Sequence, residues 1–164
     1  MEERVGIILS KGKEYMGIPY KAWHPNLSCY GDKGPFWAFN GPPPDFTAVK
    51  TGLLNSAGLI NLLRRELFLE VPGAFEESIY AGGTYEWYVF LDSYKKLKPF
   101  KEGVNYPLGT LLLRRFYSQR DEGHIAIVSG KNTILSSIRS HGVCETEISR
   151  GYYHAVCRPE DWLT

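Results

Sequence analysis

The chain has 164 residues, of which 43% are hydrophobic, and its formal net charge is +1. This length predicts one globular domain over 1–164 with a substantial core, and the small charge argues against nucleic-acid or membrane partners. No apolar run could span a bilayer, and the opening residues MEERVGIILSKGKEYMG do not resemble a secretory signal. We therefore expect a soluble protein that is cytoplasmic or is released without a signal peptide, by lysis, a secretion machine or a virion, or else a mature fragment of something longer.

The cysteines are odd in number and widely spaced: Cys29, Cys144 and Cys157. This pattern fits neither a disulfide framework nor a zinc site, so reduced, ordinary thiols are expected. The segment GGT at 82–84 is not followed by the Gly-Lys-Ser/Thr of a phosphate loop. No metal, nucleotide or flavin site is visible, and the sequence therefore predicts no cofactor.

The first part of the chain predicts helices and one long loop. A helix is expected from residue 2 to about 15, where apolar residues share one face and a Gly and a Pro follow. Residues 24–52 are rich in Gly, Pro and aromatic residues and predict a long ordered loop, of the kind that often lines a site. A second helix is expected from 54 to about 69, with Asn55 as its N-cap. An irregular or helical region follows from about 74 to 100.

The hydrophobic period then changes from that of a helix to that of a strand. The segments GTLLLRRFY and HIAIVSG predict two antiparallel strands joined by the polar loop SQRDEG. NTILSSI continues the meander, YYHAVCRP predicts a closing strand, and PEDWL a terminal cap. Because helices come first and strands follow, the predicted class is α+β.

Three polar residues occupy positions that suit catalysis. Tyr20 lies in GIPYKAW, Ser56 begins the apolar helix, and His124 opens the strand HIAIV. A helix N-terminus has free backbone N–H groups and a positive dipole, which stabilise a thiolate or an oxyanion. A histidine on a neighbouring strand can act as base and then as acid, with a third polar group orienting its ring. The expected cysteine at the helix start is absent, because Ser56 stands there.

Each of these residues also has a structural interpretation. Asn55 and Ser56 could be only a capping pair, His124 a strand-end histidine and Tyr20 ordinary core packing. Cys29 is an alternative nucleophile, although a loop rarely supplies the dipole that a reactive thiolate needs.

The other candidates are aromatic and basic residues around these positions. The aromatic residues of the long loop either form a substrate wall or anchor the loop, and Trp23 and Trp37 are candidate substrate-binding residues together with Asn55. The pairs at 64–65 and 114–115 are arginines, which are typical of solvated faces, although one could pair a substrate carboxylate.

The order of four segments resembles the NlpC/P60 cysteine peptidases. GIPY, NSAGLI, YPLGTLLLRR and GHIAIVSG follow one another between about Gly17 and Ser137. The resemblance implies a papain-like α+β domain, with N-terminal helices packed on an antiparallel sheet. It also implies cleavage of an amide bond in a peptide, many members of the family cutting cell-wall peptides.

The resemblance assigns roles residue by residue. It places Ser56 at the catalytic cysteine, Asn55 at the Asp before it, and Tyr20 at a tyrosine that helps to hold an oxyanion. His124 falls on the catalytic histidine. The third polar residue falls at or near Ser136, where the family more often has His, Asn or Gln. His141 is the spare candidate for that third role.

Serine at the nucleophile position leaves three explanations. The chain is a Cys→Ser form of a thiol peptidase, a natural pseudoenzyme that binds a peptide, or a working serine hydrolase. An acyltransferase or transglutaminase-like enzyme on the same fold is a further alternative, since water exclusion decides between hydrolysis and transfer. The resemblance implies a peptide or peptidoglycan fragment as partner, with a γ-D-Glu–diaminopimelate bond as the possible substrate.

Overall fold

The computed structural model describes residues 1–22, 35–72, 82–118 and 122–164 and has an α+β fold. The helices are α1 (Glu2–Glu14), the 3-10 helix η2 (Phe36–Ala38), α2 (Phe46–Thr51), α3 (Ser56–Arg65), α4 (Thr84–Ser93) and α5 (Pro159–Trp162). The strands are β1 (Lys98–Pro99), β2 (Leu111–Arg114), β3 (His124–Gly130), β4 (Thr133–Ile138), β5 (Gly142–Glu147) and β6 (Ala155–Cys157).

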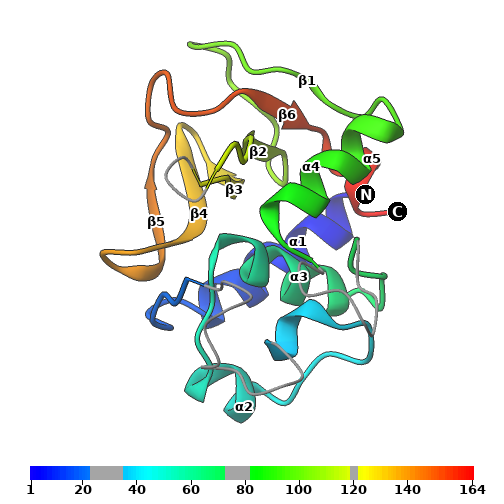
Figure 1. The fold of residues 1–164 in the computed structure, drawn as a ribbon, viewed down its shortest axis with the longest axis vertical. Helices are drawn as coiled ribbons and strands as arrows, with labels where there is room; N and C mark the ends of the chain where they lie inside the picture. Colours follow the sequence, from blue (N-terminus) through cyan, green and yellow to red (C-terminus); the bar gives the residue numbers. More distant parts are fainter. Residues whose placement is uncertain (23–34, 73–81, 119–121) are drawn as a thin grey trace.

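One antiparallel sheet contains all six strands, in the order β1-β6-β2-β3-β4-β5. Figure 1 shows the sheet in the upper part of the view, with α1, α2 and α3 below it and α4 and α5 beside it. The two ends of the chain lie close together, and the Arg4 guanidinium donates to the backbone oxygen of Leu163. The predicted fold class and the order of helices before strands are confirmed.

Several boundaries differ from the sequence-based expectations. The loop expected over 24–52 contains two short helices, η2 and α2, and its residues 24–34 lie outside the described part. Helix α3 ends at Arg65 and not near 69, because Phe68 has a φ of 56° that a right-handed helix does not admit. Strand β5 was not predicted, because its segment GVCETE carries the charged residues of an edge strand.

Helix α3 is the centre of the hydrophobic core. Its buried apolar residues are Ala57, Leu59, Ile60, Leu62 and Leu63. The sheet face toward the helices contributes Leu111, Leu113, Ile125, Ile127 and Leu135 to the same core. The opposite sheet face contributes Leu112, Ala126, Val128, Ile134 and Val156 to a second, smaller cluster. Successive strand residues therefore alternate between the two clusters, as the pleat of a strand requires.

Two arginines at the end of α3 are buried, so their assignment to a solvated face was wrong. Arg64 is 6% exposed and Arg65 is 7% exposed. The guanidinium of Arg64 donates to the backbone oxygens of Glu70 and Trp162. That of Arg65 donates to the backbone oxygens of three residues, Phe36, Gly41 and Pro42. Both side chains thus hold irregular backbone against α3, and burial lowers the pKa of Arg64 to about 10.

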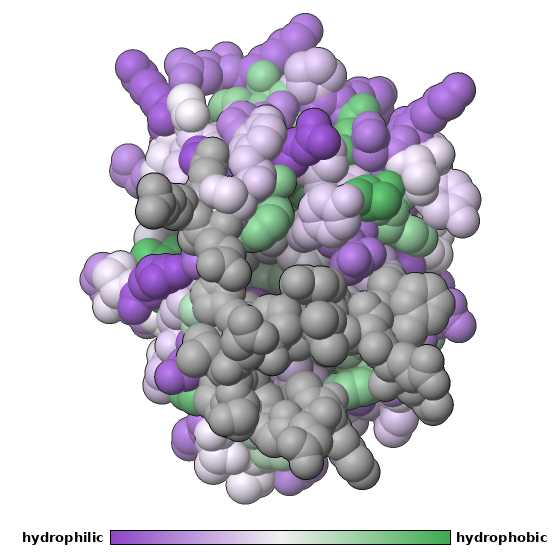
Figure 2. Space-filling view, viewed as in Figure 1, coloured by the Kyte–Doolittle hydropathy of each residue, from purple (hydrophilic) through white to green (hydrophobic). Residues whose placement is uncertain are grey.

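Where described residues form the face drawn in Figure 2, hydrophobic residues lie in small groups between hydrophilic ones. Within the described ranges, no helix combines the length and apolar character needed to cross a membrane.

Gly58 permits a close contact between α3 and the 3-10 helix η2. A Cβ at this position would lie 2.8 Å from Cδ2 of the Trp37 indole, and Trp37 is fully buried. The absence of a side chain at Gly58 therefore lets α3 rest directly on the ring.

Gly58→Ala is expected to lower the free energy of unfolding by about 1–3 kcal/mol, because overpacking outweighs the gain in helix propensity. Gly6→Ala on α1 is the matched control, because nothing lies within 4 Å of its Cβ. It should raise stability by about 0.5–1 kcal/mol. Urea unfolding measures both variants, and equal stabilisation by the two would contradict the close approach.

Candidate active site

The first turn of α3 is fixed by a side-chain cap. The Asn55 Oδ1 atom accepts a hydrogen bond of 2.7 Å from the Gly58 N–H, which confirms Asn55 as the N-cap. Ser56 is therefore the first helical residue, and it is 4% exposed. In the described part of the chain, no hydrogen bond engages the N–H groups of Ser56 and Ala57, so these amides are free to donate to an anion.

Leu54 ties this helix start to two other elements. The Leu54 N–H donates to the Pro19 oxygen at 3.2 Å, and the Leu54 oxygen accepts from the Lys21 N–H at 3.3 Å. These two bonds form an isolated parallel β-bridge between Leu54 and Tyr20. The Ser137 hydroxyl of β4 donates to the same Leu54 oxygen at 2.8 Å. These bonds bring the predicted Tyr20 and Ser56 to one end of the sheet.

Tyr20 lies among charged residues that the sequence analysis did not identify. The Arg139 guanidinium carbon lies 5.8 Å from the centroid of the Tyr20 ring, and Arg139 forms an ion pair of 2.5 Å with Glu122. Burial raises the pKa of the Tyr20 phenol, and the negative charge of Glu122 adds to the rise. The phenol therefore keeps its proton at neutral pH and can act as a hydrogen-bond donor.

His124 opens β3 and is paired in the sheet with Arg114 of β2. Its ring centroid lies 5.7 Å from that of Tyr152 and 6.2 Å from that of Tyr153. Burial lowers the pKa of His124 to about 4, and the positive charge of Arg114 adds to the effect. The imidazole is neutral at pH 7 and is therefore able to accept a proton.

The remaining link between the predicted residues is indirect. Because β3 and β4 are antiparallel, the start of β3 at His124 lies beside the end of β4, where Ser137 contacts Leu54. Tyr152 contacts the His124 ring. Burial is the main cause of the raised pKa of Tyr20, and the nearby Tyr152 phenol raises that pKa further. Among the described residues, Ser56 and His124 are not joined by a hydrogen bond.

Ser136, the predicted third residue, lies on β4 opposite Cys144. It is fully buried, and its hydroxyl makes no hydrogen bond in the described part of the structure. The role of Ser136 in orienting the His124 ring stays a prediction. The spare candidate His141 lies on an exposed turn, with its Nδ1 atom 2.7 Å from the Ser140 hydroxyl.

The three residues predicted to contact a substrate are Trp23, Trp37 and Asn55. Trp37 is 0% exposed and lies under Gly58, so the structure favours the alternative that it anchors its segment. Trp23 lies outside the described residues. Asn55 uses its side-chain oxygen as the helix cap, and its contact with a substrate stays a prediction.

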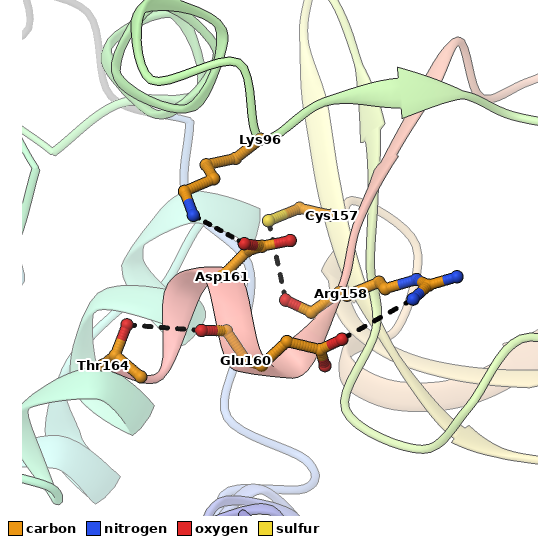
Figure 3. A network of polar contacts seen from close by, with 6 residues as sticks. All are labelled: Lys96, Cys157, Arg158, Glu160, Asp161 and Thr164. Atoms are coloured by element: carbon orange, nitrogen blue, oxygen red, sulfur yellow. Dashed lines mark hydrogen bonds and ion pairs between the residues drawn. The ribbon is translucent and has the colours of Figure 1, made fainter.

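The described cysteines are poor nucleophiles. Burial raises the pKa of the Cys157 thiol to about 12, and the nearby Asp161 carboxylate adds to the rise. Figure 3 shows this thiol pointing to the Arg158 backbone oxygen, beside the ion pair of 2.7 Å between Lys96 and Asp161. Burial also raises the pKa of Cys144. Cys29, the alternative nucleophile, lies outside the described residues.

Tyr152, Glu122 and Arg139 were not identified from the sequence, because their contacts with His124, with each other and with Tyr20 form only in the folded structure. The adjacent tyrosines of YYHAVCRP, preceding a predicted strand, were the available signal for Tyr152. No group of three or more metal-ligating side chains is present in the described ranges.

No family model matches the sequence, and neither does any curated protein. The P60 domain of antigen MAP1204 from M. avium subspecies paratuberculosis matches in structure at a TM-score of 0.56 and 14% identity, over 96% of each chain. The chain has the fold of NlpC/P60 domains.

Two further solved structures that match differ in the activity described for them. The peptidoglycan hydrolase RipB from Mycobacterium tuberculosis matches at a TM-score of 0.57 and 15% identity, over 96% of this chain and 65% of RipB. RipD from the same organism matches at 0.54 and 16%, over 94% of this chain and 96% of RipD. RipD is described as a non-catalytic NlpC/p60 protein adapted to bind peptidoglycan.

Neutral His124 makes stability depend on pH. The unfolded chain takes up a proton near pH 6.5, whereas folded His124 does so only near its pKa of about 4, so stability falls as the pH drops through this window. His124→Gln should reduce the loss between pH 7 and 4.5 by on the order of 2 kcal/mol.

Urea unfolding at the two pH values measures this loss, with His141→Gln as the control on an exposed turn. An equal loss of stability in wild type and His124→Gln would show that His124 is not held neutral by burial.

Proposed function

We propose that the chain carries an NlpC/P60-type site for cleaving an amide bond in a peptide, with residue 56 at the nucleophile position. The observation that supports this most is the side-chain-capped start of α3, with Ser56 as its first residue and with the N–H groups of Ser56 and Ala57 unbonded to any described residue. The neutral imidazole of His124 opens β3 beside the end of β4, and Tyr20 pairs with Leu54, whose oxygen accepts from Ser137 near that end of β4. With serine at position 56, the chain binds the peptide and cleaves it very slowly.

The chemistry requires a thiol at position 56. Its proton passes to the neutral His124 ring, and the thiolate sulfur attacks the amide carbonyl carbon. The oxyanion of the tetrahedral intermediate is held by the backbone N–H of residue 56 and by the Tyr20 hydroxyl. His124 returns the proton to the leaving amine, which leaves a thioester. Water then attacks the thioester with His124 as base, and the acid and the free thiol are released.

Serine at position 56 supports these reaction steps poorly. A hydroxyl is far less acidic than a thiol, whose ordinary pKa is about 8.5. The His124 ring, held neutral by burial and by Arg114, is a weak base for removing the proton of an alcohol. Binding does not depend on this proton transfer, and Ser56 therefore leaves recognition in place.

The substrate class we propose is a bacterial cell-wall stem peptide containing a γ-D-Glu–diaminopimelate bond. The support is that the structural neighbour RipB is a peptidoglycan hydrolase. The ion pair of Arg139 with Glu122 beside Tyr20 offers both charges to the polar ends of such a peptide.

A second function, peptide binding without cleavage, is favoured by one observation. The neighbour RipD is non-catalytic and adapted to peptidoglycan binding, and the serine of this chain would suit the same role. The two functions differ in whether a thiol at position 56 restores cleavage.

The test compares Ser56→Cys with the unchanged chain on intact peptidoglycan and on γ-D-glutamyl-diaminopimelate peptides, with products read by mass spectrometry. Ser56→Cys should cleave and the unchanged chain should not. Adding His124→Gln to Ser56→Cys should lower the rate by a factor on the order of 10²–10⁴, because the proton carrier is lost.

The matched control adds His141→Gln to Ser56→Cys, and this pair of changes should leave the rate intact. If Ser56→Cys binds the peptides but never cleaves them, the binding function replaces the hydrolase. If it neither binds nor cleaves, the substrate class is wrong.

A further inference from the structure

A groove lies between α4 and the end of β2, and none of its lining residues is a candidate active-site residue. It has a volume of about 190 Å³ and is lined by Tyr85, Tyr88, Val89, Asp92, Ser93 and Arg115. All of these except Arg115 belong to α4, where spacings of three and four residues place them on one face of the helix. Arg115 directly follows β2.

The Arg115 side chain is held in place without using its hydrogen-bond donors. Its guanidinium carbon lies 5.5 Å from the ring centroid of Tyr88 and 5.5 Å from that of Tyr117. Its backbone N–H donates to Nδ1 of His154 at 3.3 Å. In the described part of the chain, the guanidinium itself has no hydrogen bond and no ion pair, so its five N–H donors remain for a ligand.

Asp92 supplies the opposite charge in the same groove. It lies one helical turn after Tyr88, and its carboxylate makes no hydrogen bond or ion pair with a described residue. Both charges act on the Tyr88 phenol. Burial and then the negative charge of Asp92 raise its pKa, whereas the positive charge of Arg115 lowers it. Asp92 and Arg115 therefore lie on a common groove, near the same ring, without being paired to each other.

This arrangement restricts the ligand. A simple anion at Arg115 would be repelled by Asp92, and a simple cation at Asp92 would be repelled by Arg115. A molecule that carries both charges satisfies both side chains, and Tyr85 and Val89, which are half exposed, offer apolar surface beside them.

We propose that this groove binds the zwitterionic centre of an aliphatic α-amino acid. Arg115 binds the carboxylate through two parallel N–H donors, Asp92 accepts from the ammonium group, and Tyr85 and Val89 contact the aliphatic side chain. The inference goes beyond the proposed activity, because it requires neither Ser56 nor His124.

Norleucine is the probe, because it joins the two charges to an unbranched apolar side chain. Titrating it into ¹⁵N-labelled protein should shift the amide signals of α4 and the Arg115 Nε signal in a saturable way. Norleucinamide lacks the carboxylate and N-acetylnorleucine lacks the ammonium group, and each should bind about tenfold more weakly or worse. Arg115→Gln and Asp92→Asn should weaken norleucine binding about as much.

Arg158→Gln is the matched control, since Arg158 is an exposed arginine outside the groove. It should bind norleucine as the unchanged chain does, and the ¹⁵N spectrum of each variant verifies its fold. Absence of saturable shifts in the unchanged chain, equal binding of norleucinamide, or equal binding by Arg115→Gln and Arg158→Gln would each overturn the proposal. Because the readout is binding at α4, its failure is distinct from failure of cleavage by Ser56→Cys.

Discussion

The start of α3 depends on hydrogen bonds that come from three separate parts of the chain. Asn55 caps the helix through the Gly58 N–H, the segment around Tyr20 pairs with Leu54, and the Ser137 hydroxyl reaches the Leu54 oxygen from β4. A helix N-terminus is useful for chemistry only if its amides and its first side chain are held in one place. The packing of α3 between the sheet and the Trp37 indole supplies that rigidity and places Ser56 near the entrance of β3 and the exit of β4.

The environment of His124 bears on the role that we propose for residue 56. Burial and Arg114 keep the imidazole neutral, so it can receive a proton but holds that proton weakly. A thiolate nearby would stabilise the protonated ring by its negative charge, whereas a neutral hydroxyl gives no such help. Under the proposed assignment, a thiol at position 56 would benefit from His124 in a way that serine does not.

Several helices and strands could be predicted from the sequence, because α1 and α3 have apolar residues at helical spacing and β2 to β4 are short apolar runs that are buried on both faces of the sheet. The short helices η2 and α2 and the edge strand β5 have no such pattern and depend on tertiary contacts. Asn55 as a cap was predictable because capping is local. The burial of Arg64 and Arg65 was not, because their carbonyl partners come from Trp162, Gly41 and other distant residues. The contacts of His124 with Tyr152 likewise join β3 to residues far along the chain.

The most direct test of the active-site assignment is the pH dependence of alkylation of the thiol introduced by Ser56→Cys, using iodoacetamide and mass spectrometry of the peptide that contains position 56. A site built for a nucleophile predicts an apparent thiol pKa well below the ordinary value of about 8.5, and a rise in that pKa when His124→Gln is added. A thiol pKa at or above that ordinary value, unchanged by His124→Gln, would contradict the assignment of the α3 start as a nucleophile site.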